Sequence, residues 1–243
     1  MNRSELIDKI ETIRSKLGDF VETYNIKSKA APIKFVFFEY FIEHILRTCR
    51  RLRQPRGHSV LIGHGGSGKQ SVCKLSSFIM TGKPNYFETF AVGGDLNLKK
   101  FKIIIKETIK HSGLHPVVLL LTDNNVCYDF ILENINNLLN NGEIPNLLEN
   151  EWNKIDETGA IQFDSYDHFV QTTRKNLHVL FCTSPVGDLL RIRFRRFPAL
   201  LNCCSLDWFM PWPTEALFSC STNSFENVEI INEEEKKKVV KIV

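Results

Sequence analysis

Glycines and a lysine with the spacing of a phosphate-binding loop lie in the stretch VLIGHGGSGKQSV, residues 60–72. Gly63, Gly68 and Lys69 match the pattern G-x-x-x-x-G-K, in which backbone N–H groups turn inward around a phosphate and the lysine reaches the outer phosphates. An apolar run precedes the loop and a helical pattern follows it, so the positive end of a helix would add to the site. This context favours a nucleotide site over a glycine-rich turn with a chance lysine.

The phosphate contacts are assigned to nine consecutive residues: Gly63, His64, Gly65, Gly66, Ser67, Gly68, Lys69, Gln70 and Ser71. One position departs from the pattern, because a Ser or Thr after the lysine normally binds Mg²⁺ through its hydroxyl and this chain has Gln70 there. An amide oxygen can also bind a hard cation, so Gln70 stays a candidate metal ligand. Ser71 lies about 100° further round the helix and is no automatic substitute. We expect ATP or ADP to bind, with altered geometry for Mg²⁺.

A second element of a nucleotide site is the apolar run PVVLLLTDNN, residues 116–125. An apolar strand that ends in an aspartate is a Walker B pattern, in which Asp123 would hold Mg²⁺ through water. Many ATPases place a glutamate directly afterwards to activate the attacking water, and this chain has Asn124. An amide cannot accept a proton as a general base, although it could orient a water. The alternative is a buried strand that ends in a solvent-facing aspartate, and the loop upstream favours the metal site.

Two further groups of polar residues follow a later apolar run, LHVLFCTS. If that strand lies between the loop strand and the Walker B strand, Thr183 or Ser184 at its tip would face the terminal phosphate. An ordinary strand-to-turn residue before Pro185 is an equal alternative. The next helix carries four arginines: Arg191, Arg193, Arg195 and Arg196. ATPases in a ring need an arginine that reaches a neighbour's nucleotide, while for any single arginine a solvated basic face is the simpler interpretation.

These residues can meet only if the chain builds a sheet beneath them. From His58 onward, short apolar runs alternate with helical periodicity, which predicts an α/β domain with right-handed crossovers. The run VVLLL has no polar residue, as is typical of a strand buried on both faces of a parallel sheet. The predicted strands are HSVLIG, YFETF, PVVLLLTD, LHVLFCTS and CCSLDWF. We therefore expect a parallel sheet flanked by helices.

The two ends of the chain differ from this central region. Residues 4–25 predict an amphipathic helix, because Leu6, Ile10, Ile13, Leu17, Phe20 and Tyr24 recur at spacings of three and four. A second apolar helix is expected over about residues 35–52. The predicted organisation is residues 1–32 as N-terminal helix and connector, 33–217 as the nucleotide-binding subdomain, and 218–243 as a polar linker and the start of a further helical unit, cut off at Val243.

Composition excludes several classes of function. A net charge of +3 is too small to indicate nucleic acid as the main partner, although RTCRRLRQPR is a local basic cluster. Seven cysteines without a C-x-x-C pair argue against a disulfide framework or a zinc site and suit a reducing, cytoplasmic compartment. The N-terminus is no signal peptide, and no apolar run approaches the roughly 20 residues of a membrane helix. We expect neither a nucleic-acid nor a membrane partner.

Three long runs resemble the fourth AAA+ module of dynein heavy chains, especially the axonemal type. They are RQPRGHSVLIGHGGSGKQSV, INNLLNNGEIPNLL and NLHVLFCTSPVGDLLRIRFRRFPALLNCCSLDWFMPWPTEAL. The likeness extends from about residue 20 to about residue 217, and that family also has Gln after the loop lysine. It implies the P-loop NTPase fold of an AAA+ large subdomain with the start of a helical lid. It also implies a ring of six linked modules that moves along microtubules, with the fourth as a regulatory nucleotide site.

The resemblance also implies roles for single residues. Gly63 to Gln70 would bind the phosphates, Asp123 the metal, and Ser184 would be the first sensor. The arginine finger would be one of the four arginines, for which we favour Arg195, directed at the third module's nucleotide. The adenine pocket would lie near Phe35 and Val36. The implied partners are the neighbouring modules, microtubules through the full-length motor, and dynein intermediate and light chains through the full complex, in the axoneme of a cilium or flagellum.

The chain also departs from the family pattern. The segment FAVGGDLNLKKFKIIIKETIKHSGLH is looser than the family, and Asn124 is not the acidic residue of hydrolysing modules. The lid, the stalk, the linker and the other modules are missing, so we expect a fragment or a truncated product. Two alternatives remain open. One is an independent P-loop enzyme such as a small-molecule kinase, which would need an acceptor pocket. The other is a structural ring module without nucleotide, which Gln70 and Asn124 favour and Lys69 and Asp123 oppose.

Overall fold

The computed structural model describes residues 3–28, 32–33, 36–82, 87–89, 98–124, 126, 128–145, 147 and 163–225. The chain divides into two compact units. One is His44–Phe209, and the other combines Met1–Glu43 with Met210–Val243. The larger unit contains both nucleotide-site patterns. The subdomain boundaries predicted after residues 32 and 217 stay predictions.

The larger unit is built on a five-stranded sheet, β1 (His58–Gly63), β2 (Phe87–Thr89), β3 (Val117–Thr122), β4 (Leu177–Thr183) and β5 (Cys204–Phe209). The strand order is β2-β3-β4-β1-β5, and every pair of neighbours is parallel. Every residue of β1 and β4 is buried, as expected for strands covered on both faces. The predicted strands and the parallel α/β fold are confirmed.

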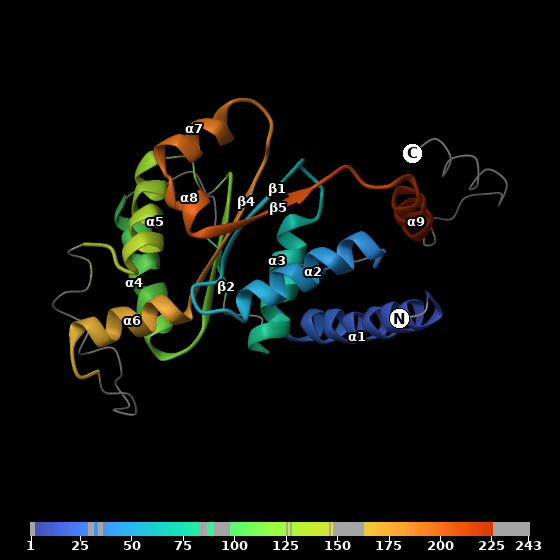
Figure 1. The fold of residues 1–243 in the computed structure, drawn as a ribbon, viewed down its shortest axis with the longest axis horizontal. Coiled ribbons are helices and arrows are strands. Elements are labelled where there is room, and N and C mark those ends of the chain that lie inside the picture. Colours follow the sequence, from blue (N-terminus) through green and yellow to red (C-terminus); the bar gives the residue numbers. More distant parts are fainter. Residues whose placement is uncertain are drawn as a thin grey trace. The chain divides into compact units, whose positions relative to one another are not determined.

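Helices cover both faces of this sheet. They are α2 (Glu39–Leu52), α3 (Lys69–Thr81), α4 (Leu98–Leu114), α5 (Asp129–Asn141), α6 (Tyr166–Asn176), α7 (Leu189–Arg196) and α8 (Ala199–Asn202). In Figure 1, α2 and α3 lie on one side of the strands, and α4, α5 and α6 lie on the other. The second apolar helix, expected from about residue 35, begins at Glu39. In the described part of the chain, no helix combines the length and apolar character needed to cross a bilayer.

Glycines end the two helices that flank the site region. Gly82 follows α3 with φ 66° and Gly142 follows α5 with φ 82°, and in each the backbone N–H bonds the carbonyl four residues earlier. A left-handed residue at this place is the usual C-terminal stop, and only glycine adopts it without strain. At the other end of a helix, the Ser165 side chain accepts a hydrogen bond from the His168 N–H and caps α6. Local sequence therefore sets these boundaries.

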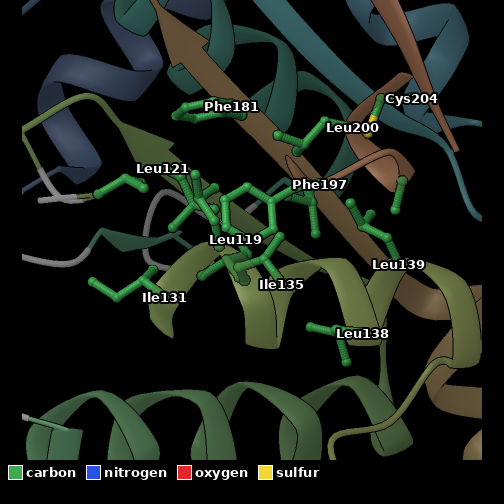
Figure 2. Packing of buried hydrophobic residues seen from close by; sticks show 14 of the residues in the cluster. Leu119, Leu121, Ile131, Ile135, Leu138, Leu139, Phe181, Phe197, Leu200 and Cys204 are labelled. Atoms are coloured by element: carbon green, nitrogen blue, oxygen red, sulfur yellow. The ribbon is translucent and has the colours of Figure 1, made fainter. Parts of the chain in front are cut away.

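A hydrophobic cluster holds the strand ends in place. Leu119 and Leu121 of β3 and Phe181 of β4 pack with Ile131 and Ile135 of α5, and each is at most 1% exposed. Figure 2 shows these side chains together between the strands and α5. Because β3 and β4 share this core and their ladder, the residues that follow Thr122 and Cys182 have fixed relative positions. That geometry matters for Asp123 and Thr183.

The smaller unit contains α1 (Arg3–Lys27) and α9 (Thr214–Phe225). The predicted N-terminal helix is confirmed, and Leu17 and Tyr24 of its apolar stripe are buried. Phe20 is 40% exposed, so the stripe is not buried as a whole within this unit. The same unit contains an aromatic cluster, in which the centroid of the Trp212 ring lies 5.5 Å from that of Phe38 and 5.9 Å from that of Phe41.

The segment after residue 217 differs from the prediction. We expected a polar linker from residue 218, and the chain is helical through Phe225. The hydroxyls of Ser221 and Thr222 both donate to the Phe218 carbonyl at 2.8 Å, so polar side chains are satisfied by the helix itself. The helical start predicted further on lies outside the described residues.

A buried histidine at the start of β1 predicts a pH dependence of folding. Burial, followed by the nearby charges of His178, Arg56 and Arg51, lowers the pKa of His58 to about 3. Its Nδ1 accepts a hydrogen bond from the Val179 N–H at 3.0 Å and must stay unprotonated. The unfolded chain takes up this proton near pH 6.5, the folded chain does not, and stability is therefore lost as pH falls below about 6.5.

We expect this residue to contribute a loss of up to about 1.4 kcal/mol per pH unit to the free energy of unfolding. Urea unfolding at pH 7 and pH 5 measures it. His58→Asn keeps an acceptor for Val179 and should flatten the pH dependence, while His111→Asn, on the exposed side of α4, should not. An equally steep pH dependence in His58→Asn would contradict the assignment.

Candidate phosphate-binding site

A cavity of about 440 Å³ opens at the carboxyl ends of β1, β3 and β4. It brings together residues from all three predicted motifs: Gly65, Gly66, Ser67, Gly68, Lys69, Gln70, Ser71, Thr122, Asp123, Asn124, Cys182, Thr183 and Ser184. Because β4 pairs with both β1 and β3, its tip lies between the loop and the Walker B aspartate, which was the condition for a role of Thr183 or Ser184. Gly63 and His64 do not line this cavity.

The loop has the backbone that its glycines predict. Gly66 has φ 77° and Gly68 has φ 82°, a region in which other residues are strained. Gly68 immediately precedes α3 and provides no side-chain cap. The first N–H groups of an α-helix have no partner within the helix, so those of α3 could bind an anion at its positive end. Gly63 has a different function, because a side chain there would come within 2.6 Å of Phe209 Cβ on β5.

Lys69 points back into its own loop. Its Nζ lies 2.6 Å from the Gly63 carbonyl, 2.6 Å from the His64 carbonyl and 3.0 Å from Ser67 Oγ. These contacts use three donors, the full number that an ammonium group has. Burial lowers the pKa of Lys69, while nearby groups including Asp123 oppose the shift. A phosphate in the cavity would compete with these loop oxygens for the lysine.

Asp123 is the centre of a network at the strand tips. Its Oδ1 accepts from Thr183 Oγ1 at 2.8 Å, and its Oδ2 accepts from the Ser184 N–H at 2.6 Å. The Ser184 hydroxyl instead accepts from the Val186 N–H at 3.4 Å. Thr183 therefore provides the side chain that contacts Asp123, and Ser184, the predicted sensor, contacts it through the backbone.

Arg193 of α7 also binds Asp123. Its guanidinium lies 2.5 Å from Asp123 Oδ1, donates to the Val126 carbonyl at 3.0 Å and packs over the Phe181 ring at 5.7 Å. From the sequence alone, Arg193 was only one of four arginines on a basic helix. The sequence did contain a signal for the burial of Arg193. Leu190 lies three residues before it and Phe197 four residues after it, and both are apolar, so this spacing places Arg193 on the same, buried face of α7.

The other three arginines of α7 are exposed. Arg196 pairs with Asp129 at 2.5 Å, and Arg191 lies 3.9 Å from Asp188. Arg195 makes no hydrogen bond or ion pair with the described part of the chain. α7 thus directs one arginine at its own site and leaves Arg195 at the surface.

Comparison with known proteins identifies the family of this chain. A family model described as "P-loop containing dynein motor region D4" matches residues 33–243. The chain belongs to this dynein family. Human dynein axonemal heavy chain 6 is 36% identical over 95% of the chain, and human dynein axonemal heavy chain 17 is 37% identical over 92%. The Dynein-1-beta heavy chain of the flagellar inner arm I1 complex of Chlamydomonas reinhardtii is 31% identical over 98%.

The chain spans only 5–6% of the length of these dynein heavy chains. Among solved structures, the closed state of Hsp104 with ATPγS and FITC casein matches 96% of the chain and 42% of its own, with 14% identity and a TM-score of 0.49. The family model and the strand order, rather than that likeness, establish the AAA+ fold of the module. The predicted resemblance to dynein is confirmed.

The dynein module offers a divalent cation few ligands. Asp123 is the one acidic residue among those described as lining the cavity, and its carboxylate already accepts hydrogen bonds from Thr183, Ser184 and Arg193. Within the described residues there is no group of three His, Cys, Asp or Glu side chains placed to hold a metal. The predicted metal ligands, Asp123 and Gln70, both line the cavity, and their role in holding Mg²⁺ stays a prediction.

Of two further predicted sites in the dynein module, the structure places the expected catalytic position and leaves the adenine pocket undecided. Asn124 is exposed and lines the cavity directly beside Asp123, at the position of the expected catalytic glutamate. Of the two residues of the predicted adenine pocket, Phe35 lies outside the described residues and Val36 belongs to the smaller unit. The adenine pocket stays a prediction.

Proposed function

We propose that this chain is a regulatory nucleotide-binding module of a dynein ring, which holds ATP or ADP and hydrolyses it slowly or not at all. The observation that carries the proposal is the single cavity shared by the loop residues 65–71, Asp123, Asn124 and the tip of β4. A volume of about 440 Å³ lies within the usual range for small-molecule sites. The N-terminus of α3 and Lys69 supply the positive potential that phosphates need.

Slow hydrolysis follows from the residues beside the cavity. Asn124 cannot accept the proton of an attacking water. Asp123 is the single carboxylate of the described lining, and it is already bound by Arg193, Thr183 and the Ser184 N–H. Thr183 and Ser184 can orient a water but cannot deprotonate it at neutral pH. The site therefore suits a bound regulatory nucleotide better than rapid turnover.

The larger assembly is part of the same proposal. The direct partners in this proposal are neighbouring AAA+ modules of one heavy chain, which the match to dynein heavy chains supports. Microtubules and the intermediate and light chains would be reached through the full motor. Their axonemal names support a place in the axoneme of a cilium or flagellum. Membership of a motor family disfavours an independent kinase.

A structural module without nucleotide is the second candidate, and one observation favours it: Lys69 is held by oxygens of its own loop. Thermal unfolding separates the two. A nucleotide at 100 times its dissociation constant stabilises the folded chain by about 2.7 kcal/mol, which raises the melting temperature by several degrees. A structural module melts at the same temperature with and without ADP.

Replacing the loop lysine should weaken binding. In Lys69→Ala we expect ADP affinity to fall about tenfold to a hundredfold, because a charge-assisted hydrogen bond to phosphate contributes roughly 1.5–3 kcal/mol. Isothermal calorimetry measures the change. Lys74→Ala is the matched control, since Lys74 lies on the same helix and does not line the cavity. Equal affinity in Lys69→Ala and the control would rule out the phosphate assignment.

A further inference from the structure

The carboxylate of Asp123 is neutralised by a group of its own chain. The Arg193–Asp123 pair is 2.5 Å long, and the arginine side chain is only 8% exposed while that of the aspartate is 32% exposed. An arginine keeps its charge at any ordinary pH. Asp123 Oδ1 already accepts two hydrogen bonds, one from Arg193 and one from Thr183. The described lining of the cavity therefore contains no carboxylate without a counter-charge.

Arg193 is fixed in this position by contacts besides the ion pair. The Val126 carbonyl, the Phe181 ring and the buried face of α7 all hold it. If the guanidinium moved away, a buried carbonyl would lose its donor and the carboxylate would lose its positive partner, and both losses are costly. Arg196, three residues later, forms a similar pair with Asp129 at an exposed place, where the pair is easily broken.

We propose that the guanidinium of Arg193 acts as the resident counter-cation of Asp123, so that ATP or ADP binds this site with little dependence on Mg²⁺. In an ordinary P-loop site a divalent metal offsets the repulsion between acidic side chains and phosphates. Here Arg193 offsets the only such carboxylate among the described lining residues, and Gln70 stands where a metal-binding hydroxyl would be. The proposal rests on the proposed nucleotide binding and adds a charge-compensation role for Arg193, one of the four arginines among which the family resemblance places the arginine finger.

Calorimetry of ADP binding to the full chain, with Mg²⁺ and with EDTA, tests this role. For the unchanged chain we expect the two dissociation constants to agree within about threefold, because no uncompensated carboxylate faces the phosphates. In Arg193→Gln the exposed charge of Asp123 should repel the phosphates. The affinity in EDTA should then fall by about tenfold or more relative to that in Mg²⁺.

Three further variants separate charge from structure. Arg193→Lys keeps the charge and should keep the small Mg²⁺ dependence. Asp123→Asn combined with Arg193→Gln removes both charges, retains a hydrogen-bonding pair and should also show little dependence. Arg191→Gln, at an exposed position of the same helix, should match the unchanged chain. If Arg193→Gln fails to fold, ADP binding that requires Mg²⁺ in the unchanged chain, or in Arg193→Lys, would still overturn the inference.

The possible outcomes are distinct. ADP binding in both Mg²⁺ and EDTA, with a dependence that appears only in Arg193→Gln, supports the role of Arg193. Binding of ADP only in the presence of Mg²⁺ overturns this inference and leaves the proposed nucleotide site intact. No binding in either condition overturns both. A strong Mg²⁺ dependence in the doubly neutral variant would show that the metal acts through ligands other than Asp123, which also contradicts the inference.

Discussion

Replacing Arg195 with alanine should slow ATP hydrolysis at the preceding module of a dynein ring, by about 10³–10⁵-fold if the arginine acts as strongly as the best-known fingers. The affinity for ADP at the loop of Lys69 should stay nearly unchanged. The structure narrows the choice among the four arginines of α7. Arg193 is buried against Asp123, while Arg195 is exposed and makes no polar contact with the described part of the chain. A side chain in that state is available to a neighbouring module.

The test needs a heavy chain that carries this module beside its neighbour. One assay measures turnover with only the preceding site intact, and a second measures ADP affinity at this module's own site. Arg191→Ala, at another exposed position of the same helix, is the matched control. Arg196→Ala is the second variant to make, since an error of one residue in helix phase turns a side chain by about 100°. If Arg195→Ala lowers the ADP affinity of this module's own site while ATP turnover at the preceding module stays normal, Arg195 acts within its own module.

The strands and the loop could be predicted because their signals are local. Apolar runs such as residues 117–121 need burial on both faces, and the spacing of Gly63, Gly68 and Lys69 fixes a loop between strand and helix. The order of the strands in the sheet could not be predicted from local sequence. The position of β4 between β1 and β3 was only a condition for a role of Thr183 or Ser184, and the ladder registers show that β4 does lie there.

The contacts of the charged groups could not be predicted in the same way. Arg193 and Asp123 are 70 residues apart, and their pairing depends on how α7 is rotated against the sheet. Helical phase alone placed Arg193 on the face of Leu190 and Phe197, but the identity of the group beneath that face is set by tertiary packing. Lys69 is similar, because loop carbonyls carry no side-chain signal and its bonds to them appear only in three dimensions. Local patterns therefore predicted which residues gather at the site and missed how their charges are paired.

Replacing Asn124 with glutamate should increase hydrolysis at this module's own site by about 10²–10⁴-fold, the usual contribution of a positioned general base. Asn124 follows Asp123 directly and lines the cavity, so a carboxylate there would face a water beside the terminal phosphate of a bound nucleotide. We expect the increase in hydrolysis only when the lid and the neighbouring module are present, because the sensor residues and an arginine finger are also needed. ATP turnover by that longer protein is the measurement.

Asn124→Gln is the matched control, since it lengthens the side chain as glutamate does without providing a base. Brisk turnover by the unmodified site would contradict this account, and so would the absence of any gain in Asn124→Glu with both neighbours in place. The variant also bears on the charge balance of the cavity. Glutamate adds a carboxylate that Arg193 does not neutralise, so ADP affinity in EDTA should fall relative to that in Mg²⁺, and Asn124→Gln should leave the ratio unchanged. Asn124→Glu alone would then supply the missing general base and also make ADP binding depend on a divalent cation. Slow hydrolysis and weak dependence on Mg²⁺ would therefore share one cause, the lack of a carboxylate without a counter-charge in the described lining of the cavity.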